Sequence, residues 1–152
     1  MDKENLKQVL TEWAPDVIYD ESGEWLNAEL PPGSWPEVAW KLRNTPALSF
    51  DYLFCLTCID WKTHLTMVYH LTSTHHRLPL VVKAKLDRSA PAISTVSHIW
   101  RTAEFHEREC HELFGVDFLC HPDLRLLILP DGWEGKYPLR KDFEDPVNMI
   151  KL

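Results

Sequence analysis

Three consecutive runs with the alternation of β-strands constrain the fold more than any other feature of this sequence. They cover Ser49 to Asp60, Thr63 to Thr72 and Leu78 to Leu86. Only residues 61–62 and 73–77 separate them, and such segments are too short for the crossover that parallel neighbours require. The three runs therefore predict an antiparallel meander.

The pattern of each run indicates which of its faces is buried. The second and third runs place apolar residues at alternate positions, which is typical of a strand with one face in the core. The inward residues would be Leu65, Met67, Tyr69, Leu71, Leu80, Val82, Ala84 and Leu86. The first run is apolar on both faces, so we expect it to be the central strand.

Amphipathic segments predict helices on either side of the meander. Leu6, Val9, Leu10 and Trp13 share one face of a helix that ends before Pro15. Residues 102–114 form another helix, which Gly115 would end at its C′ position. Ser34-Trp35-Pro36-Glu37 is typical of a capping box that opens another helix, closed by Pro46. Short strands are expected over residues 17–19 and 24–30, and a helical turn over 97–100. We therefore expect an α+β fold, an antiparallel or mixed sheet of about four to five strands with helices packed on it.

The pattern changes after Gly115. Residues 116–152 show no helical period, and proline recurs at positions 122, 130, 138 and 146. A segment that long without secondary structure is either disordered or functional, and its many large apolar residues argue against disorder. We expect an α+β domain over residues 1–115 and an extended arm over residues 116–152 that contacts partner subunits.

Charge and hydropathy exclude several classes of function. Sixteen Lys and Arg against 23 Asp and Glu give a net charge of −7, which argues against a nucleic-acid-binding protein. The sequence lacks both an apolar stretch long enough to span a bilayer and a targeting pattern at its start. It also has no glycine-rich loop that could hold a phosphate.

The four cysteines suggest a metal site that strand geometry argues against. Cys55 and Cys58 form a C-x-x-C pair that could join Cys110-His111 and Cys120-His121. Positions i and i+3 of a strand point to opposite faces, so both thiols would not reach one metal ion. The cysteines are expected to be free, with Cys55 and Cys58 as small core residues. No role follows from the pattern for Cys110 or Cys120.

Charged residues crowd the predicted helix over residues 102–114. Glu104, Arg108 and Glu112 have the spacing of surface ion pairs, and Glu107 and Glu109 lie between them. A charge run on a helix is usually a solvated face. The functional alternative is a pair of carboxylates that act as acid and base, but nothing in the pattern selects such a pair.

The arm carries the most specific motifs. Glu107-Arg108-Glu109 and Leu113-Phe114-Gly115, followed by His121-Pro122-Asp123-Leu124-Arg125, Trp133-Glu134-Gly135 and Pro138-Leu139-Arg140-Lys141-Asp142, resemble the C subunit of the NADH–quinone oxidoreductases of respiratory complex I. The likeness extends from about Leu48 to Phe143 and includes Asp60. Cys120 stands where glycine is expected, and the linker at Lys136-Tyr137 is one residue longer than usual.

The resemblance implies a cofactor-free structural subunit. It would belong to the peripheral arm of a proton-translocating complex, on the cytoplasmic side of the membrane, without a membrane span of its own. The complex as a whole uses NAD, FMN, iron–sulfur clusters and quinone. The expected partners are the subunit with the terminal cluster and the subunit that forms the quinone pocket. The motif residues would form the interface, with Arg108 where the helix meets the arm and Arg140 paired with a partner's carboxylate.

Other functions stay open on the sequence. The chain could be the equivalent subunit of a related membrane-bound hydrogenase. A small metal-dependent enzyme would use the Cys and His residues, and a free-standing regulatory module would be monomeric.

Overall fold

The computed structural model describes residues 3–149, which contain three helices and seven strands. Their bounds, in chain order, are α1 Lys3–Trp13, β1 Ile18–Asp20, β2 Asn27–Leu30, α2 Trp35–Asn44, β3 Tyr52–Asp60, β4 His64–Ser73, β5 Leu78–Asp87, β6 Ala92–Ser94, α3 Ala103–Phe114 and β7 Asp117–Leu119.

Five of the strands form one mixed sheet in the order β1-β2-β5-β4-β3. The strands β3, β4 and β5 make the predicted antiparallel meander. The strand β2 pairs with β1 antiparallel and with β5 in parallel. The parallel pair is possible because α2, β3 and β4 supply the long connection that it needs. The expected α+β class is confirmed.

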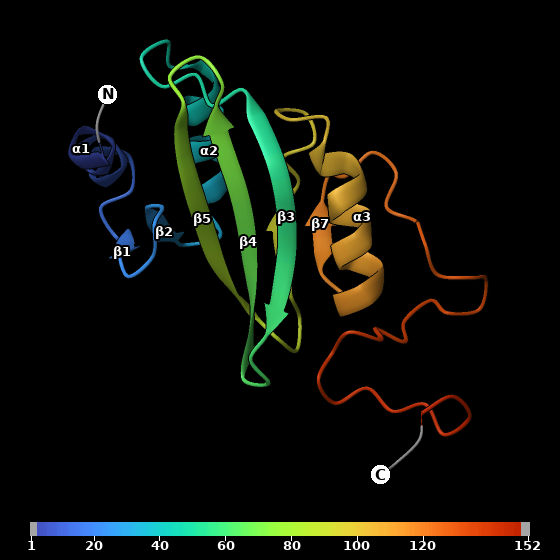
Figure 1. The fold of residues 1–152 in the computed structure, drawn as a ribbon. Helices are drawn as coiled ribbons and strands as arrows, with labels where there is room; N and C mark the ends of the chain where they lie inside the picture. The colour runs from blue at the N-terminus through green and yellow to red at the C-terminus, as the bar shows by residue number, and fades with distance from the viewer. Residues whose placement is uncertain (1–2, 150–152) are drawn as a thin grey trace.

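The core lies between the sheet and the helices. Figure 1 shows α2 behind β4 and β5, with α3 beside β3. Trp35 at the start of α2 contacts Tyr69 and Trp100, with ring centroids 4.7 and 6.2 Å away. The eight residues expected to point inward from β4 and β5 are all buried. Each buried aliphatic side chain stabilises the fold by about 1.5–3 kcal/mol.

The strand β3 corrects one expectation, because it is the edge strand of the sheet and not a central one. A β-bulge between Leu53 and Cys55 changes which residues face the core. On the outer face, Phe54 packs against Trp25 and His70. Helix α3 contacts β3 on the inner side. An edge strand with apolar neighbours on both faces therefore has the pattern that predicted a central one.

The start of α2 corrects a second expectation. Ser34 already has helical backbone angles and makes no side-chain cap. Its hydroxyl donates instead to the Pro31 carbonyl at 2.9 Å. Pro36 does lie in the first turn of the helix, where a missing N–H costs little. The prediction of a capping box is therefore wrong, although the helix that was predicted to follow it is present.

Two short strands were not predicted. The strands β6 and β7 form a separate parallel pair, and the Thr95 amide extends it by donating to the Leu119 carbonyl at 2.9 Å. Residues 117–119 belong to the predicted arm, yet Phe118 is buried in the core. Strands of three residues are too short to show a period. Residues 120–149 form the longest described segment without helix or strand, and from here on we call them the arm.

Candidate interaction site at helix α3 and the arm

Helix α3 ends as the sequence predicted and presents its charges to the arm. Gly115 has φ +80° and its amide donates to the His111 carbonyl at 2.9 Å. Three charged residues of the helix, Glu107, Arg108 and Glu112, are 0%, 7% and 3% exposed. The solvated-face interpretation is therefore wrong for these residues, and each makes hydrogen bonds to groups outside the helix.

Glu112 binds the backbone of the arm. Its carboxylate accepts hydrogen bonds from the amides of Leu127, Ile128 and Leu129, at 2.7, 2.9 and 3.3 Å. Hydrogen bonds to a charged acceptor are among the strongest in proteins, about 1.5–3 kcal/mol each. One buried carboxylate therefore fixes three consecutive residues of a segment that has no secondary structure.

Arg108 binds the backbone carbonyls of the adjoining residues of the arm. Its Nε and Nη2 donate to the carbonyls of Arg125 and Leu126, at 3.1 and 2.6 Å. Its guanidinium also lies over the Phe105 ring, 5.6 Å from the centroid. Arg108 forms no ion pair with Glu104 or Glu112 within residues 3–149. We call residues 125–130, fixed by these two side chains, the strap.

Glu107 binds the segment that follows β6 and lies beside the start of the arm. Its carboxylate accepts hydrogen bonds from the Thr95 hydroxyl and from the Val96 amide. The ring of His121 lies close, with Nε2 3.6 Å from Oε2 of Glu107. Burial raises the pKa of Glu107 to about 7, because desolvation disfavours the charged form.

Both ring nitrogens of His121 make hydrogen bonds to the backbone. Its Nδ1 accepts a hydrogen bond from the Asp123 amide at 3.0 Å, so the proton is on Nε2. That Nε2–H donates to the Glu104 carbonyl at 3.0 Å. The contact of His121 with Glu107 is therefore not an ion pair. The His-Pro-Asp motif makes a turn that docks on α3.

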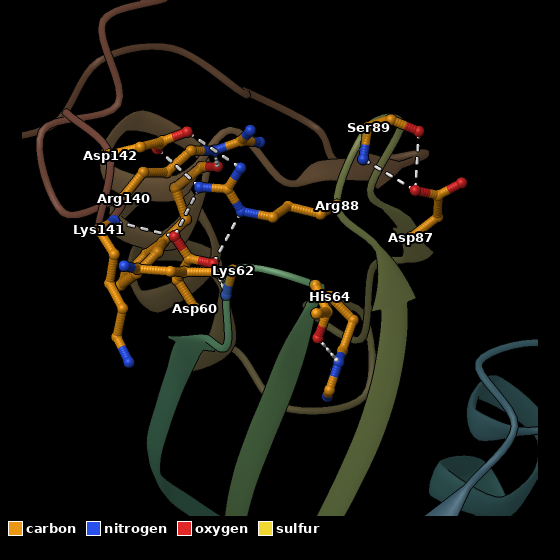
Figure 2. A network of polar contacts seen from close by, with 11 residues as sticks. Asp60, Lys62, His64, Asp87, Arg88, Ser89, Arg140, Lys141 and Asp142 are labelled. Carbon is orange, nitrogen blue, oxygen red and sulfur yellow. Dashed lines mark hydrogen bonds and ion pairs between the residues drawn. The ribbon is translucent and has the colours of Figure 1, made fainter.

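A second anchor binds the arm to the end of the sheet, as Figure 2 shows. Arg88 donates through Nε and Nη2 to both oxygens of Asp60, at 2.8 Å each. The same guanidinium donates to Asp142 at 2.6 and 3.1 Å. Asp60 also accepts the amides of Lys62 and Lys141, at 2.8 and 2.9 Å. We call Asp60, Arg88, Lys141 and Asp142 the clasp.

The clasp determines the ionisation of its carboxylates. The hydrogen bonds from Arg88 hold the pKa of Asp60 far below its usual range, and they lower that of Asp142 as well. Asp60 is part of the family resemblance, but no feature of the sequence selected Arg88. Arg88 follows a strand with outward lysines, and no local pattern distinguishes it from them.

Arg140 binds the end of α3 within its own chain, and its expected pair with a partner's carboxylate stays a prediction. Its Nε donates to the Phe114 carbonyl at 2.6 Å, at the C-terminal end of α3. Its guanidinium lies over the Tyr137 ring, 5.0 Å from the centroid. A Cβ on Gly115 would come within 2.7 Å of that ring. Residues 137–140 therefore dock on the last turn of α3 in their own chain.

The other motif residues divide between packing and exposure. Trp133 lies 6.3 Å from the Phe143 ring, and Lys136 lies over Trp133 at 4.6 Å. Glu134 accepts the Gly132 amide at 3.0 Å. Glu109 and Pro138 are half-buried, and the motif residues that face solvent are Pro122, Arg125, Glu134, Gly135, Leu139, Lys141 and Asp142.

Of the two cysteines expected in the core, Cys58 is buried, but Cys55 is only half-buried, so the expectation is wrong for Cys55. All four are free: Cys58 and Cys110 are buried, Cys55 is half-buried and Cys120 is exposed. Burial raises the pKa of the Cys58 thiol to about 12. Within residues 3–149, no group of three or more His, Cys, Asp or Glu side chains is arranged to hold a metal ion.

The comparison with known families decides what this arrangement belongs to. Residues 28–147 match the family model of the 30 kDa subunit of respiratory-chain NADH dehydrogenase. The chain belongs to this family. The match includes the strap, the clasp and all three buried charges of α3.

Curated relatives agree with this assignment. The C subunit of the NADH-quinone oxidoreductase of Chlorobium phaeobacteroides is 35% identical, over 93% of this chain and 92% of its own length. The C subunit of the F(420)H(2) dehydrogenase of Methanosarcina mazei is 36% identical, over 95% and 93%. The corresponding NADH-quinone oxidoreductase protein of Chloroherpeton thalassium, 39% identical, is longer, and this chain spans 47% of it.

Solved structures share the fold. A chain of the membrane-bound sulfane sulfur reductase, an archaeal respiratory membrane complex, is 29% identical with a TM-score of 0.77, over 93% of this chain and 85% of its own. The trypsin-resistant fragment (1–134) of Nqo5 is 28% identical with a TM-score of 0.67, over 78% of this chain and 98% of the fragment. In residues 3–149, no helix is long and apolar enough to cross a bilayer.

Proposed function

We propose that this chain is a cofactor-free structural subunit in the peripheral arm of a proton-translocating NADH:quinone oxidoreductase, where it supports electron transfer to quinone without catalysing it. One observation carries the proposal: Glu107, Arg108 and Glu112 are buried, Arg108 and Glu112 bind the backbone of the arm, and Glu107 binds the segment that follows β6. These side chains position segments of the backbone. A rigid, displayed segment suits a subunit that binds neighbouring proteins.

The comparisons support a role in an assembled complex. The chain from the archaeal respiratory membrane complex matches 93% of this chain, whereas the trypsin-resistant fragment of Nqo5 matches 78%. We propose that the arm contacts the subunit with the terminal iron–sulfur cluster and the subunit that forms the quinone pocket. Both would lie on the cytoplasmic side of the membrane.

The test is to tag the chain in its own cells and to isolate the membrane complex. We expect equal amounts of this chain and of the iron–sulfur and quinone-pocket subunits, and loss of NADH:quinone reductase activity when its gene is deleted. A tagged chain that elutes as a free monomer, in cells whose activity survives the deletion, would overturn the proposal.

A separate measurement tests whether the chain itself binds metal or oxidises NADH. We expect the purified chain to bind no iron or zinc and to oxidise no NADH. Stoichiometric metal that disappears in Cys58→Ala would contradict this, and would favour a metal-dependent enzyme.

A second candidate is the equivalent subunit of a related membrane complex with another electron donor, such as a hydrogenase. The relative in an F(420)H(2) dehydrogenase and the chain from a sulfane sulfur reductase complex support it. Measuring quinone reduction by the isolated complex with NADH, reduced F420 and hydrogen in turn distinguishes the candidates.

A further inference from the structure

The strap exposes an unusual run of apolar residues. Residues 126–130 read Leu-Leu-Ile-Leu-Pro, and none of them is buried. Ile128 is 67% exposed and Leu127 is 37% exposed. Leu127 and Ile128 are therefore adjacent exposed apolar side chains between two half-buried leucines, and exposed apolar patches mark interaction sites.

This exposure is imposed by the fold. The backbone of residues 125–129 is bound by Arg108 and Glu112, with the amides of Leu127 and Ile128 directed at the carboxylate. The two side chains cannot turn inward without breaking these bonds to buried charges. The surface is therefore formed before a partner arrives, which lowers the entropic cost of binding.

A hollow of about 490 Å³ adjoins the strap, and Leu126, Asp131, Glu134 and Tyr137 contribute to its lining. Asp131 and Glu134 are exposed, and neither forms an ion pair within the described residues. Arg125, which also lines the hollow, donates through Nε to Asp123 at 2.9 Å. The unpaired charge at the hollow is therefore negative.

We infer that the strap and the hollow form one docking surface for another subunit, which covers Leu127 and Ile128 with apolar side chains and places a lysine or arginine beside Asp131 and Glu134. Charge complementarity selects this occupant, because a second copy of this chain would bring like-charged hollows together. The inference rests on the proposed function and adds which part of the arm binds and what chemistry it meets.

The first test locates the partner by photo-crosslinking in the assembled complex. A benzophenone amino acid replaces Ile128 in one tagged chain, and replaces Ile18, which is 66% exposed on β1, in a matched control. We expect position 128 to crosslink to one other subunit, at an apolar segment that carries Lys or Arg, and position 18 to crosslink much less. Crosslinks to a second copy, or equal yields at the two positions, would overturn the inference.

The second test measures the chemistry. Ile128→Asp should lower incorporation into the complex about tenfold or more, as expected for an anchor residue, and Ile18→Asp should not. The double variant Asp131→Asn, Glu134→Gln should lower it severalfold and weaken its dependence on salt. All variants should keep the melting temperature of the isolated chain. Normal incorporation of Ile128→Asp, or of the double variant, overturns the corresponding half of the inference.

The two hypotheses fail in different ways. If the unmodified chain never enters a complex, the proposed function is wrong, and this inference is wrong with it. If the unmodified chain enters a complex and the strap variants enter equally well, only this inference is wrong.

Discussion

Residues 3–119, which we call the sheet domain, and the arm are held in place by different forces. In residues 3–149, the buried apolar side chains lie between Leu6 and Phe118, all within the sheet domain. The arm beyond that point is fixed by hydrogen bonds to buried charges, chiefly Glu112 and Asp60. Apolar burial is cooperative over a whole domain, whereas each anchor of the arm acts on a few residues. The two regions should therefore lose their structure separately.

A core substitution should have the largest effect and should act on both regions. Leu65→Ala removes a fully buried side chain of β4 and should cost about 2–5 kcal/mol of unfolding free energy. Leu139→Ala, in the arm and 54% exposed, should change it by about 0.5 kcal/mol or less. Urea unfolding followed by circular dichroism measures both. Equal costs would mean that the arm is part of the same cooperative unit.

Removing an anchor should loosen the arm and spare the sheet. Glu112→Gln keeps one acceptor oxygen but loses the charge that three amides share, a loss of about 1.5–3 kcal/mol. Amide hydrogen exchange should become faster at residues 127–129 and stay unchanged in β4. Glu109→Gln, half-buried on the same helix, is the control. Faster exchange throughout β4 would contradict the separation.

A pH titration sharpens the comparison where the two regions meet. The pKa of Glu107 is about 7 in the folded chain and near 4.3 when unfolded, so the folded state binds the proton more tightly. Its contribution to stability should be complete below about pH 4 and fall as the pH rises to about 7. Urea unfolding at pH 5.5 and pH 8 should show lower stability at pH 8. Glu107→Gln should remove this difference, and an unchanged difference would assign it to another group.

The smallest expected effect is a gain in stability at Cys120, where the sheet domain meets the arm. Cys120 has φ +63°, a conformation that glycine adopts without strain. Cys120→Gly should therefore stabilise the chain by about 0.5–1 kcal/mol, in spite of the added freedom when unfolded. Val147→Gly, at another exposed position of the arm, should give no gain. Differential scanning calorimetry can measure both variants, and a loss in Cys120→Gly would show that the thiol makes a compensating contact.

The sheet domain was largely predictable because side-chain periodicity reports burial directly. Each residue that the alternation in β4 and β5 placed inward is buried, and Gly115 marked the end of α3. Prediction failed where burial does not follow period: the bulge in β3 reversed its faces, and β6 and β7 are too short to alternate. The Ser34 hydroxyl donates to the carbonyl of Pro31, three residues earlier in the chain, and the residue pattern around Ser34 does not indicate this contact.

For the site, family motifs identified the residues but not their surroundings. Glu107, Arg108 and Glu112 have the spacing of a solvated helix face, and only the folded arm buries them. Arg140 binds the end of α3 in its own chain, a contact that its motif did not indicate. Arg88 has no local signal at all, because its partners are Asp60 and Asp142, far away in the sequence. Long-range polar contacts of this kind are set by tertiary structure.

The clasp has a consequence for the order in which the chain acquires its structure. Glu112 reaches Leu127 across 15 positions, whereas Arg88 reaches Asp142 across 54 and Asp60 reaches Lys141 across 81. Closing a longer loop costs more chain entropy and slows folding. We expect the strap to settle on α3 soon after synthesis passes residue 129, and the clasp to close only when residue 142 is available. A nascent or truncated chain that ends between these positions would already display Ile128 while the rest of its arm is still free.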